Sequence, residues 1–337
     1  MMPSLMHDVD LAPFTTFAVP AKAADFVEVE SLEELKAVLA SAGAEKPRFI
    51  LGGGSNVLFT KDFAGLVVRM KIEGLEVVAE DETSRTIRVG AGCDWSALVD
   101  ETLARGWPGL ENLALVPGTV GGAAVQNIGA YGLEAAERIV SVECLDARTL
   151  ETVEMTVDEC DYGYRSSVFK RPEAAHLIVT AVTMTLPKAF EPRIEYKELA
   201  AYFAGAVPQT ATEVAEAVKA IRRRKLPDPK VLPNAGSFFK NPVVTRIKER
   251  HLLEDMPTLV SYSLAGGRAK LAAGWLIEAV GMKGERRGNA GVYERQALVL
   301  VNHGGATGAE IKALADEVAD KVWRRFGVKL EPEPVIL

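Results

Sequence analysis

Short apolar runs and one amphipathic stretch alternate along the first half of the chain. Ser31-Leu-Glu-Glu34 forms a capping box ahead of apolar residues at helical spacing, Leu35, Val38 and Leu39, so a helix is expected to begin there. An apolar strand at Arg48–Leu51 runs directly into a glycine-rich turn. The pattern further predicts strands at 66–70, 75–79, 86–89, 139–145 and 177–186, and a helix from about residue 94.

The pattern after residue 210 predicts a second group of elements. A helix over residues 212–224 ends at Leu226-Pro-Asp-Pro229, because proline cannot continue it. A helix over 270–280, a strand over 296–302 and a long helix after the capping box Thr307-Gly-Ala-Glu310 follow. We therefore expect an α+β protein with domains over residues 1–70, 71–209 and 210–337, in which the C-terminal residues can pack back against the first domain.

Composition places the chain among ordinary globular proteins. Of its 337 residues, 48% are hydrophobic and 25% are charged. No apolar run approaches the length of a membrane span, and the first residues lack the basic end and apolar core of a secretory signal. The net charge of −7 argues against nucleic acid as the main partner, although a local group of Lys and Arg can still bind an anionic small molecule.

Cysteine and histidine are too scattered to predict a site. Cys93, Cys144 and Cys160 show neither CxxC spacing nor a pairing pattern, which favours a reduced, cytoplasmic setting with buried thiols. The four histidines are equally dispersed, so no metal site is expected.

Two glycine-rich segments are the first candidates for ligand binding. Residues 52–56, Gly-Gly-Gly-Ser-Asn, follow a strand and can offer backbone N–H groups to a pyrophosphate. Their spacing matches neither GxGxxG nor GxxxxGK[ST], and a tight turn that needs positive φ explains them equally well. Residues 116–132 contain five glycines and no charge, so this loop is expected to lie against a large flat ligand or another backbone.

A third candidate is the segment over residues 234–242, Asn-Ala-Gly-Ser-Phe-Phe-Lys-Asn-Pro. Taken alone, Ser237 is explained by a turn hydroxyl; without a histidine nearby in sequence it is a poor nucleophile, yet it can still donate a proton. The basic run over residues 222–225 is, on most proteins, a solvated helix end. Glu331 and Glu333 by themselves are typical of surface charge.

These segments occur together and in one order, and in that combination the chain resembles the UDP-N-acetylenolpyruvoylglucosamine reductases (MurB), in their longer type I form. The resemblance runs from Thr16 to Glu333, nearly the whole chain. The motifs that carry it are GGSNVL at 53–58, PGLENLALVPG at 108–118, QNIGAYG at 126–132, YGYR at 162–165, KLPDPK at 225–230, the 234–242 segment, LAAGWLI at 271–277 and LEPE at 330–333.

The resemblance implies a FAD-binding fold of the p-cresol methylhydroxylase (VAO) type in two subdomains, with an α+β substrate-binding domain after it. It implies reduction of the enolpyruvyl group of UDP-N-acetylenolpyruvoylglucosamine to UDP-N-acetylmuramate, with noncovalent FAD and with NADPH as hydride donor. Such an enzyme serves peptidoglycan synthesis, and through it cell shape and cell division, in the cytoplasm. Its expected partners are the UDP-sugar and NADPH, without nucleic acid or membrane insertion, and the chain is expected to be a monomer.

Motif positions imply roles for single residues. Ser237 resembles the family's proton donor, and Arg165 and Glu333 resemble the pair that polarises the substrate carboxylate. The positions that match flavin contacts are Gly52, Gly53, Gly54, Ser55, Asn56, Pro117, Gly118, Gly122, Ile128 and Gly129. The positions that match substrate contacts are Tyr131, Tyr196 on a mobile loop, Lys225, Asn241, Lys283 and Gln296.

Two features depart from the family pattern. Thr15-Thr16-Phe17 stands where relatives have Asn-Thr-Phe, and Pro334 follows Glu333 where an apolar strand residue is usual. The proline is expected to remove one strand hydrogen bond beside that carboxylate.

Two alternative functions stay open: another FAD oxidoreductase of the same fold, and a non-catalytic nucleotide-sugar binding protein. No histidine occurs between His7 and His176, which disfavours the first in its form with covalently bound FAD. The joint presence of Ser237, Arg165 and Glu333 disfavours the second.

Overall fold

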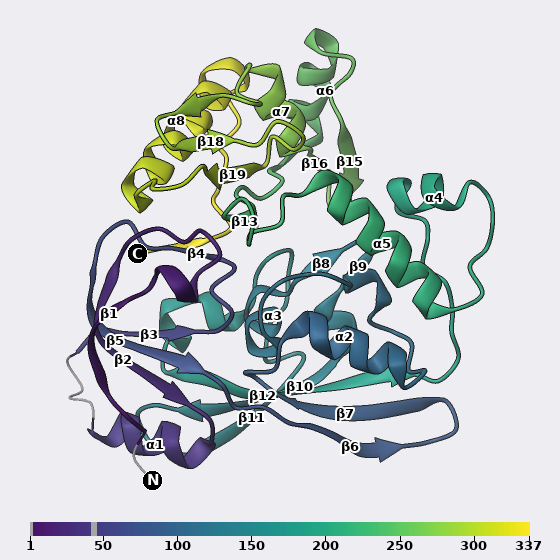
Figure 1. Ribbon diagram of the computed structural model, residues 1–337. Coiled ribbons are helices and arrows are strands. Elements are labelled where there is room, and N and C mark those ends of the chain that lie inside the picture. Colours follow the sequence, from purple (N-terminus) through teal and green to yellow (C-terminus); the bar gives the residue numbers. More distant parts are fainter. Residues whose placement is uncertain (1–2, 42–45) are drawn as a thin grey trace. The chain divides into compact units, whose positions relative to one another are not determined.

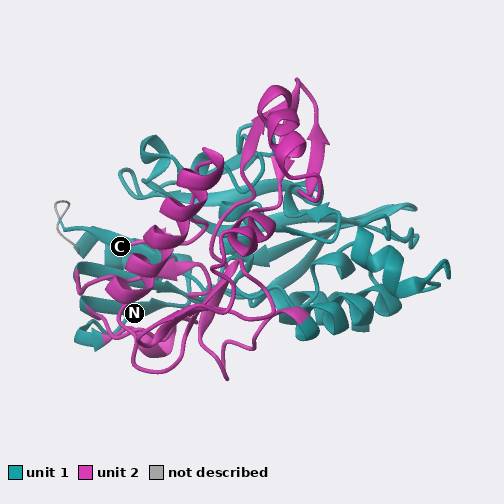
Figure 2. Cartoon of the chain, turned by 90° about the horizontal axis from the view of Figure 1, so that it is seen from above, with its two compact units in different colours: residues 1–9, 23–53, 64–224 teal, residues 10–22, 54–63, 225–337 magenta. Residues whose placement is uncertain are grey.

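The computed structural model describes residues 3–41 and 46–337 (Figure 1). They form two compact units, each assembled from segments far apart in sequence (Figure 2). The first unit comprises residues 1–9, 23–53 and 64–224, and the second comprises residues 10–22, 54–63 and 225–337. The expected domain boundaries near residues 70 and 210 stay a prediction.

The first unit is built on two main sheets. A four-stranded sheet has the order β1 (Met6–Asp10), β2 (Lys22–Val29), β5 (Phe63–Met70), β3 (Arg48–Leu51), in which β3 and β5 are parallel. A five-stranded antiparallel sheet has the order β11 (Thr152–Thr156), β10 (Ile139–Asp146), β12 (Leu177–Pro187), β7 (Ser84–Gly90), β6 (Leu75–Glu80).

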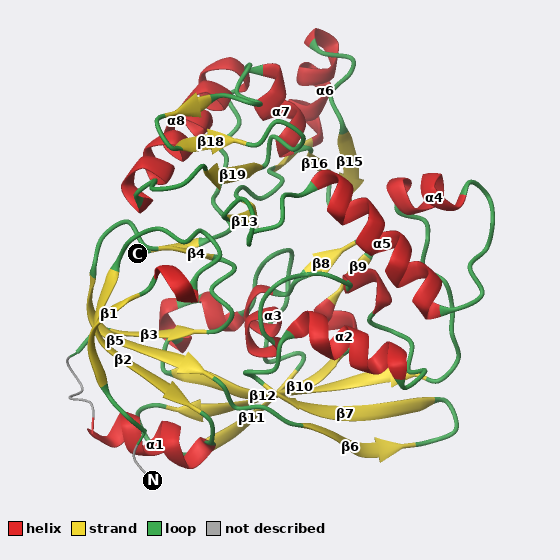
Figure 3. Cartoon of the chain, in the orientation of Figure 1, coloured by secondary structure: helices red, strands yellow, loops and turns green. Residues whose placement is uncertain are grey.

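The helices of this unit are α1 (Leu32–Ser41), α2 (Trp95–Ala104), α3 (Val120–Gln126), α4 (Lys197–Phe203) and α5 (Ala211–Lys225). Helix α3 packs on β7 and β12, and α2 lies beside it on the same face of the sheet (Figure 3). Helix α2 begins where the sequence predicts, because the Asp94 carboxylate accepts a hydrogen bond of 2.8 Å from the N–H of Ala97.

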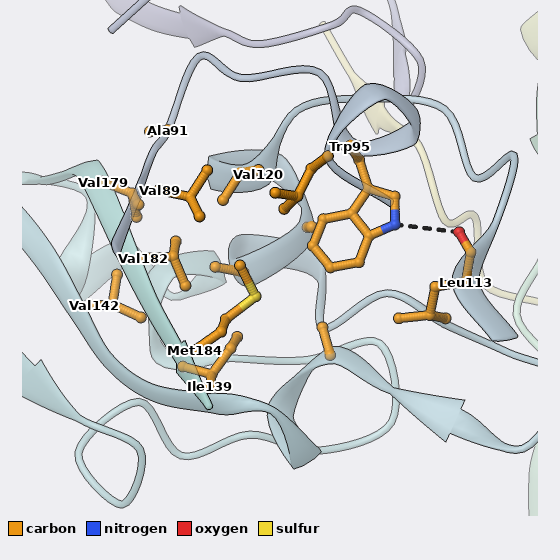
Figure 4. Packing of buried hydrophobic residues seen from close by; sticks show 14 of the residues in the cluster. Val89, Ala91, Trp95, Leu113, Val120, Ile139, Val142, Val179, Val182 and Met184 are labelled. Atoms are coloured by element: carbon orange, nitrogen blue, oxygen red, sulfur yellow. Dashed lines mark hydrogen bonds between the residues drawn. The ribbon is translucent and has the colours of Figure 1, made fainter. Parts of the chain in front are cut away.

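The core of the first unit lies between the five-stranded sheet and these helices. Val89, Val182 and Met184 from the sheet pack with Trp95 and Val120 from the helices (Figure 4). The Trp95 indole N–H donates to the carbonyl of Leu113 at 3.2 Å, so this large buried ring leaves no polar group unpaired.

The second unit combines smaller sheets with three helices. Its four-stranded sheet has the order β13 (Asn234–Ser237), β19 (Val299–Asn302), β18 (Ala290–Val292), β17 (Arg286–Arg287). A three-stranded sheet has the order β14 (Val243–Thr245), β16 (Arg268–Leu271), β15 (Ser261–Leu264), and β20 (Val335–Ile336) pairs in parallel with β4 (Val57–Leu58). The helices are α6 (Arg246–Asp255), α7 (Ala273–Ala279) and α8 (Gly308–Phe326).

Helix α8 follows its predicted start and covers β18 and β19. The Thr307 hydroxyl accepts from the N–H of Glu310 at 3.2 Å, and the Glu310 carboxylate accepts from the N–H of Thr307 at 2.7 Å. The predicted capping box is therefore confirmed. Within residues 3–41 and 46–337, no helix is long and apolar enough to cross a membrane.

Two elements differ from those expected. The helix predicted over residues 270–280 is wrong at its start, because Arg268–Leu271 pairs with strands on both sides. The glycine-rich segment over residues 116–132 contains helix α3 where a loop is expected. The hydroxyl of Thr119 caps this helix, and Gly121 lets it lie so near the sheet that a Cβ there would stand 2.8 Å from the Cβ of Ala91.

Candidate active site

In the first unit, the two glycine-rich segments lie against each other. A Cβ on Gly53 would stand 2.9 Å from the Cα of Gly118, and a Cβ on Gly52 would stand 2.5 Å from Oγ1 of Thr119. The close approach of two backbones therefore requires glycine at position 53, and the side chain of Thr119 occupies the space that a Cβ at position 52 would need. The same lack of side chains leaves backbone N–H groups uncovered, as pyrophosphate binding needs.

In the second unit, the Thr15-Thr16-Phe17 segment joins the end of the glycine turn to the strand of Ser237. Gly54 has φ +63°, and a Cβ there would stand 1.9 Å from the carbonyl oxygen of Phe14. The Gly54 carbonyl accepts a hydrogen bond of 3.0 Å from the N–H of Thr16, whose own carbonyl accepts one of 2.9 Å from Asn234. This segment, which departs from the family pattern, is therefore a structural link.

These residues fit a flavin dinucleotide. The glycine backbones supply donors for its pyrophosphate, and Gly122 and Pro117 are exposed beside them. In the first unit, Nε2 of Gln126 is a buried polar atom that lacks a partner among the described residues. Buried polar groups are normally hydrogen-bonded, so a polar atom of a bound cofactor is a suitable partner for it.

Arg165 is held against the glycine-rich segment of the first unit. Its Nη2 donates to the carbonyl of Gly129 at 2.6 Å, and its Nη1 donates to the carbonyl of Asn127 at 3.4 Å. A Cβ on Gly129 would stand 2.9 Å from Nη1. Arg165 also has φ +53°, a strained backbone for a large side chain that typically marks a functional site.

Tyr131 and Tyr196, both predicted to contact substrate, meet in the first unit. Their ring centroids are 5.3 Å apart, and the rings are inclined by 71°. Tyr131 sits in the two-residue turn between β8 (Gly129–Ala130) and β9 (Leu133–Glu134). Tyr196 is the residue before helix α4.

The basic run over residues 222–225 is divided by the fold. Arg222 is half-buried and hydrogen-bonds the hydroxyl of Tyr131, whereas Arg223 and Arg224 are exposed. Burial raises the pKa of Tyr131, and Arg222 opposes this effect. Lys225 ends helix α5 and is half-buried. The run therefore does not form a single anion-binding cluster.

The second unit brings Ser237 and the segment of Glu333 together. Ser237 ends β13, whose register with β19 shifts between Asn234 and Ser237; such a bulge redirects the following side chain. The side-chain carbonyl of Asn234 accepts a hydrogen bond of 2.8 Å from the N–H of Gly236, which fixes the turn before the serine. The N–H of Glu333 donates to the carbonyl of Phe238 at 2.8 Å.

Proline does not interrupt the chain around Glu333. The N–H of Glu333 is bonded to Phe238, and the N–H of Val335 donates to the carbonyl of Asn56 at 3.0 Å. Pro334, which has no N–H to donate, lies between these two donors, and the backbone is hydrogen-bonded on both sides of it. The expected loss of a strand hydrogen bond beside Glu333 is therefore not seen. The amide of Asn56 also donates to the Glu333 carbonyl at 3.3 Å.

Two of the predicted substrate residues in the second unit converge on the start of helix α7. The side-chain carbonyl of Asn241 accepts from the N–H of Ala273 at 2.9 Å. Oε1 of Gln296 lies 3.1 Å from the position of a Cβ on Gly274. Lys283 is not part of this group, because its ammonium binds the carboxylate of Glu278 at 3.0 and 3.1 Å.

Tyr262 and Lys270 form a further candidate pair that the sequence analysis does not name. They are register partners on β15 and β16, and the Lys270 ammonium lies 5.8 Å from the Tyr262 ring centroid. The tyrosine is 45% exposed, so the pair offers an aromatic face and a cation to a planar, anionic ligand. The alternation of Ser and apolar residues over Ser261–Leu264 is its only signal in the sequence.

Comparisons with known proteins agree with this arrangement. A model of a FAD binding domain matches residues 23–153. A model of the UDP-N-acetylenolpyruvoylglucosamine reductase C-terminal domain matches residues 228–337. The expected α+β architecture with a FAD-binding fold is confirmed.

Two relatives that match nearly the whole chain carry the same name. The chain is 48% identical over 334 residues to the UDP-N-acetylenolpyruvoylglucosamine reductase of Chromobacterium violaceum, with 98% of both chains covered. It is 49% identical over 341 residues to that of Burkholderia mallei, with 99% of this chain and 98% of the other covered. The crystal structure of the Thermus caldophilus UDP-N-acetylenolpyruvylglucosamine reductase matches 100% of this chain and 99% of its own, with a TM-score of 0.70 and 25% identity.

Proposed function

The chain belongs to the UDP-N-acetylenolpyruvoylglucosamine reductase family, and on this basis we propose that it makes UDP-N-acetylmuramate from its enolpyruvyl precursor with NADPH and noncovalent FAD. The roles of single residues rest above all on one observation, the 2.8 Å hydrogen bond that joins the segment of Glu333 to the residue after Ser237. The reaction takes place in the cytoplasm of a bacterium as a step of peptidoglycan synthesis, and the active form is a monomer.

The reaction adds a hydride and a proton across the enolpyruvyl double bond while NADPH becomes NADP⁺. Bound FAD, once reduced by hydride from NADPH, would supply a hydride to the terminal methylene carbon and return to its oxidised form. The electron pair of the double bond then moves toward the carboxylate as an enolate, and the carbon next to the new carbon–hydrogen bond must receive a proton. The protein therefore has to stabilise negative charge on the carboxylate and deliver a proton on one face.

Ser237 delivers this proton. The bulge in β13, the side chain of Asn234 and the positive φ of Gly236, +69°, together fix the backbone from which its hydroxyl projects. A hydroxyl is a weak acid in water, but it suffices toward a carbanion-like carbon. A positioned general acid is worth ~10²–10⁴ in rate.

Arg165 and Glu333 stabilise the enolate. The guanidinium of Arg165 is anchored by the carbonyls of Gly129 and Asn127, so it needs little reorganisation as charge develops, and such fixed donors contribute ~10²–10³ in rate. In its protonated form, Glu333 donates a hydrogen bond to the same carboxylate.

The remaining predicted residues bind the two ligands. Lys225 supplies a cation for the diphosphate. The ion pair between Lys283 and Glu278 opens when substrate binds, at a cost of about 1 kcal/mol or less, because it is largely exposed. FAD is held by backbone groups of the two glycine-rich segments and by Ser55, Asn56 and Ile128, and its binding is noncovalent.

Ser237→Ala tests the assignment by separating the two half-reactions. Stopped-flow reduction of the flavin by NADPH should keep the wild-type rate, because it delivers no proton to carbon. Reoxidation by the enolpyruvyl UDP-sugar should slow by ~10²–10⁴, and Ser237→Cys should recover part of this rate. Ser263→Ala, which removes an exposed hydroxyl of the same unit, should leave both rates unchanged. Wild-type reoxidation in Ser237→Ala would show that the proton has another source.

A further inference from the structure

Asn112 is a buried amide that joins two segments of the first unit. It lies in the turn Glu111–Leu113 and is 1% exposed. Its Nδ2 donates to the carbonyls of Tyr131 and Arg193, both at 2.8 Å. Because both partners are acceptors, only the amino end of this side chain can face them. Its Oδ1 has no partner in the described part of the chain, so the side chain is oriented for these two carbonyls.

The first carbonyl belongs to a strained residue. Tyr131 has φ +49° and Gly132 has φ +87°, as a two-residue type I′ hairpin turn requires. A bulky side chain is disfavoured in this region and persists only where its surroundings hold it. Asn112 holds the Tyr131 backbone, and Arg222 holds its hydroxyl.

The second carbonyl belongs to the irregular stretch that leads to Tyr196. Arg193 stands three residues before Tyr196, between β12 and α4. Its side chain forms an ion pair with Glu137 in which both side chains are about 40% exposed, and such pairs contribute little. The bond from the buried side chain of Asn112 is therefore the stronger attachment at this point of the stretch.

We propose that Asn112 is a positioning residue for substrate binding, which holds the stretch over residues 188–196 in register with Tyr131 so that Tyr131 and Tyr196 meet as one aromatic pair. This inference rests on the proposed role of the two tyrosines as substrate contacts. Asn112 is itself buried and acts only through the two backbones that it joins.

Asn112→Ala tests the inference by removing both donors. The KM for the UDP-sugar should rise about fivefold, the ratio that corresponds to about 1 kcal/mol, the net value of one average hydrogen bond. The rate of flavin reduction by NADPH should stay within about twofold. Trypsin should cleave faster at Lys188, Arg193 and Lys197. Glu137→Gln is the control, because it breaks the ion pair of Arg193, leaves the buried bond intact and should change KM by about twofold or less.

A double-mutant cycle separates this role from a general effect on the fold. If Asn112 acts through Tyr196, then Asn112→Ala combined with Tyr196→Ala should have the KM of Tyr196→Ala alone. If the increases in KM of the two single variants multiply in the double variant, the inference is overturned, while the role of Tyr196 stays intact. An unchanged KM in Tyr196→Ala would overturn both. If Asn112→Ala does not fold, Asn112→Ser, which keeps one donor, carries the same cycle with a smaller expected rise.

Discussion

Asn127 offers the clearest test of how the fold supports Arg165. The residue is 1% exposed, and it ends helix α3 with a backbone φ of +45°. It donates to the Glu134 carboxylate and to the carbonyl of Gly163, both at 3.0 Å, and accepts from the N–H of Ala136 at 3.0 Å. Asn127→Ala removes these bonds, at about 1 kcal/mol each, and places alanine in a left-handed conformation at a further cost of about 1 kcal/mol. The free energy of unfolding should therefore fall by about 4 kcal/mol.

The same substitution should also lower kcat, because the Asn127 side chain holds the turn that carries Arg165 through its bond to the carbonyl of Gly163. The backbone carbonyl of residue 127, which accepts from the guanidinium at 3.4 Å, is kept in the variant, but it loses the side-chain bonds that fix its position. We expect kcat to fall about tenfold or more, since loss of a fixed donor costs up to ~10³.

Asn302→Ala is the matched control. Asn302 is 2% exposed and also makes three side-chain hydrogen bonds, to Phe17, Gly304 and Ala306 at 2.9–3.0 Å, but none to the turn of Arg165. It should lose about 3 kcal/mol of stability and keep its kcat. Urea titration followed by circular dichroism measures the first quantity, and steady-state kinetics on folded protein measures the second. Equal losses of kcat in both variants would refute the link to Arg165, and a stability loss below about 1 kcal/mol in Asn127→Ala would refute the hydrogen-bond reasoning.

Two further outcomes follow from the site and the core. Lys225→Ala should weaken UDP-sugar binding by about 1.5–3 kcal/mol, the value of one charge-assisted contact, whereas Arg224→Ala, which alters an exposed neighbour, should change it little; equal titrations of flavin fluorescence for wild type and Lys225→Ala would contradict the role of Lys225. Burial raises the pKa of Cys144 to about 12 and that of Cys160 to about 11, so at about pH 8 both stay protonated and should resist iodoacetamide in folded protein but react after unfolding. Mass spectrometry locates the label, and rapid labelling of either thiol in folded protein would contradict this burial.

Structural elements that short-range contacts determine can be predicted from the sequence alone. Asp94 and Thr307 start helices through hydrogen bonds to residues three positions away, and such contacts do not depend on the rest of the fold. The apolar run of β3 also has the predicted bounds, although the strand is completed by parallel pairing with β5. The family, and with it the FAD-binding fold and the identity of Ser237, Arg165 and Glu333 as candidates, follows from motif order along the chain.

Only the tertiary structure decides which backbones pair and which polar groups are buried. Lys270 lies in a strand rather than a helix because partners flank it on both sides. Arg222 and Lys225 belong to one basic run, yet only Arg222 is turned to Tyr131. In the sequence, nothing distinguishes Asn112 from other polar residues of its motif. The fold brings two acceptors that are far apart in sequence to its side chain. These outcomes depend on contacts between distant segments, and a single sequence read locally contains no signal for which distant segments meet.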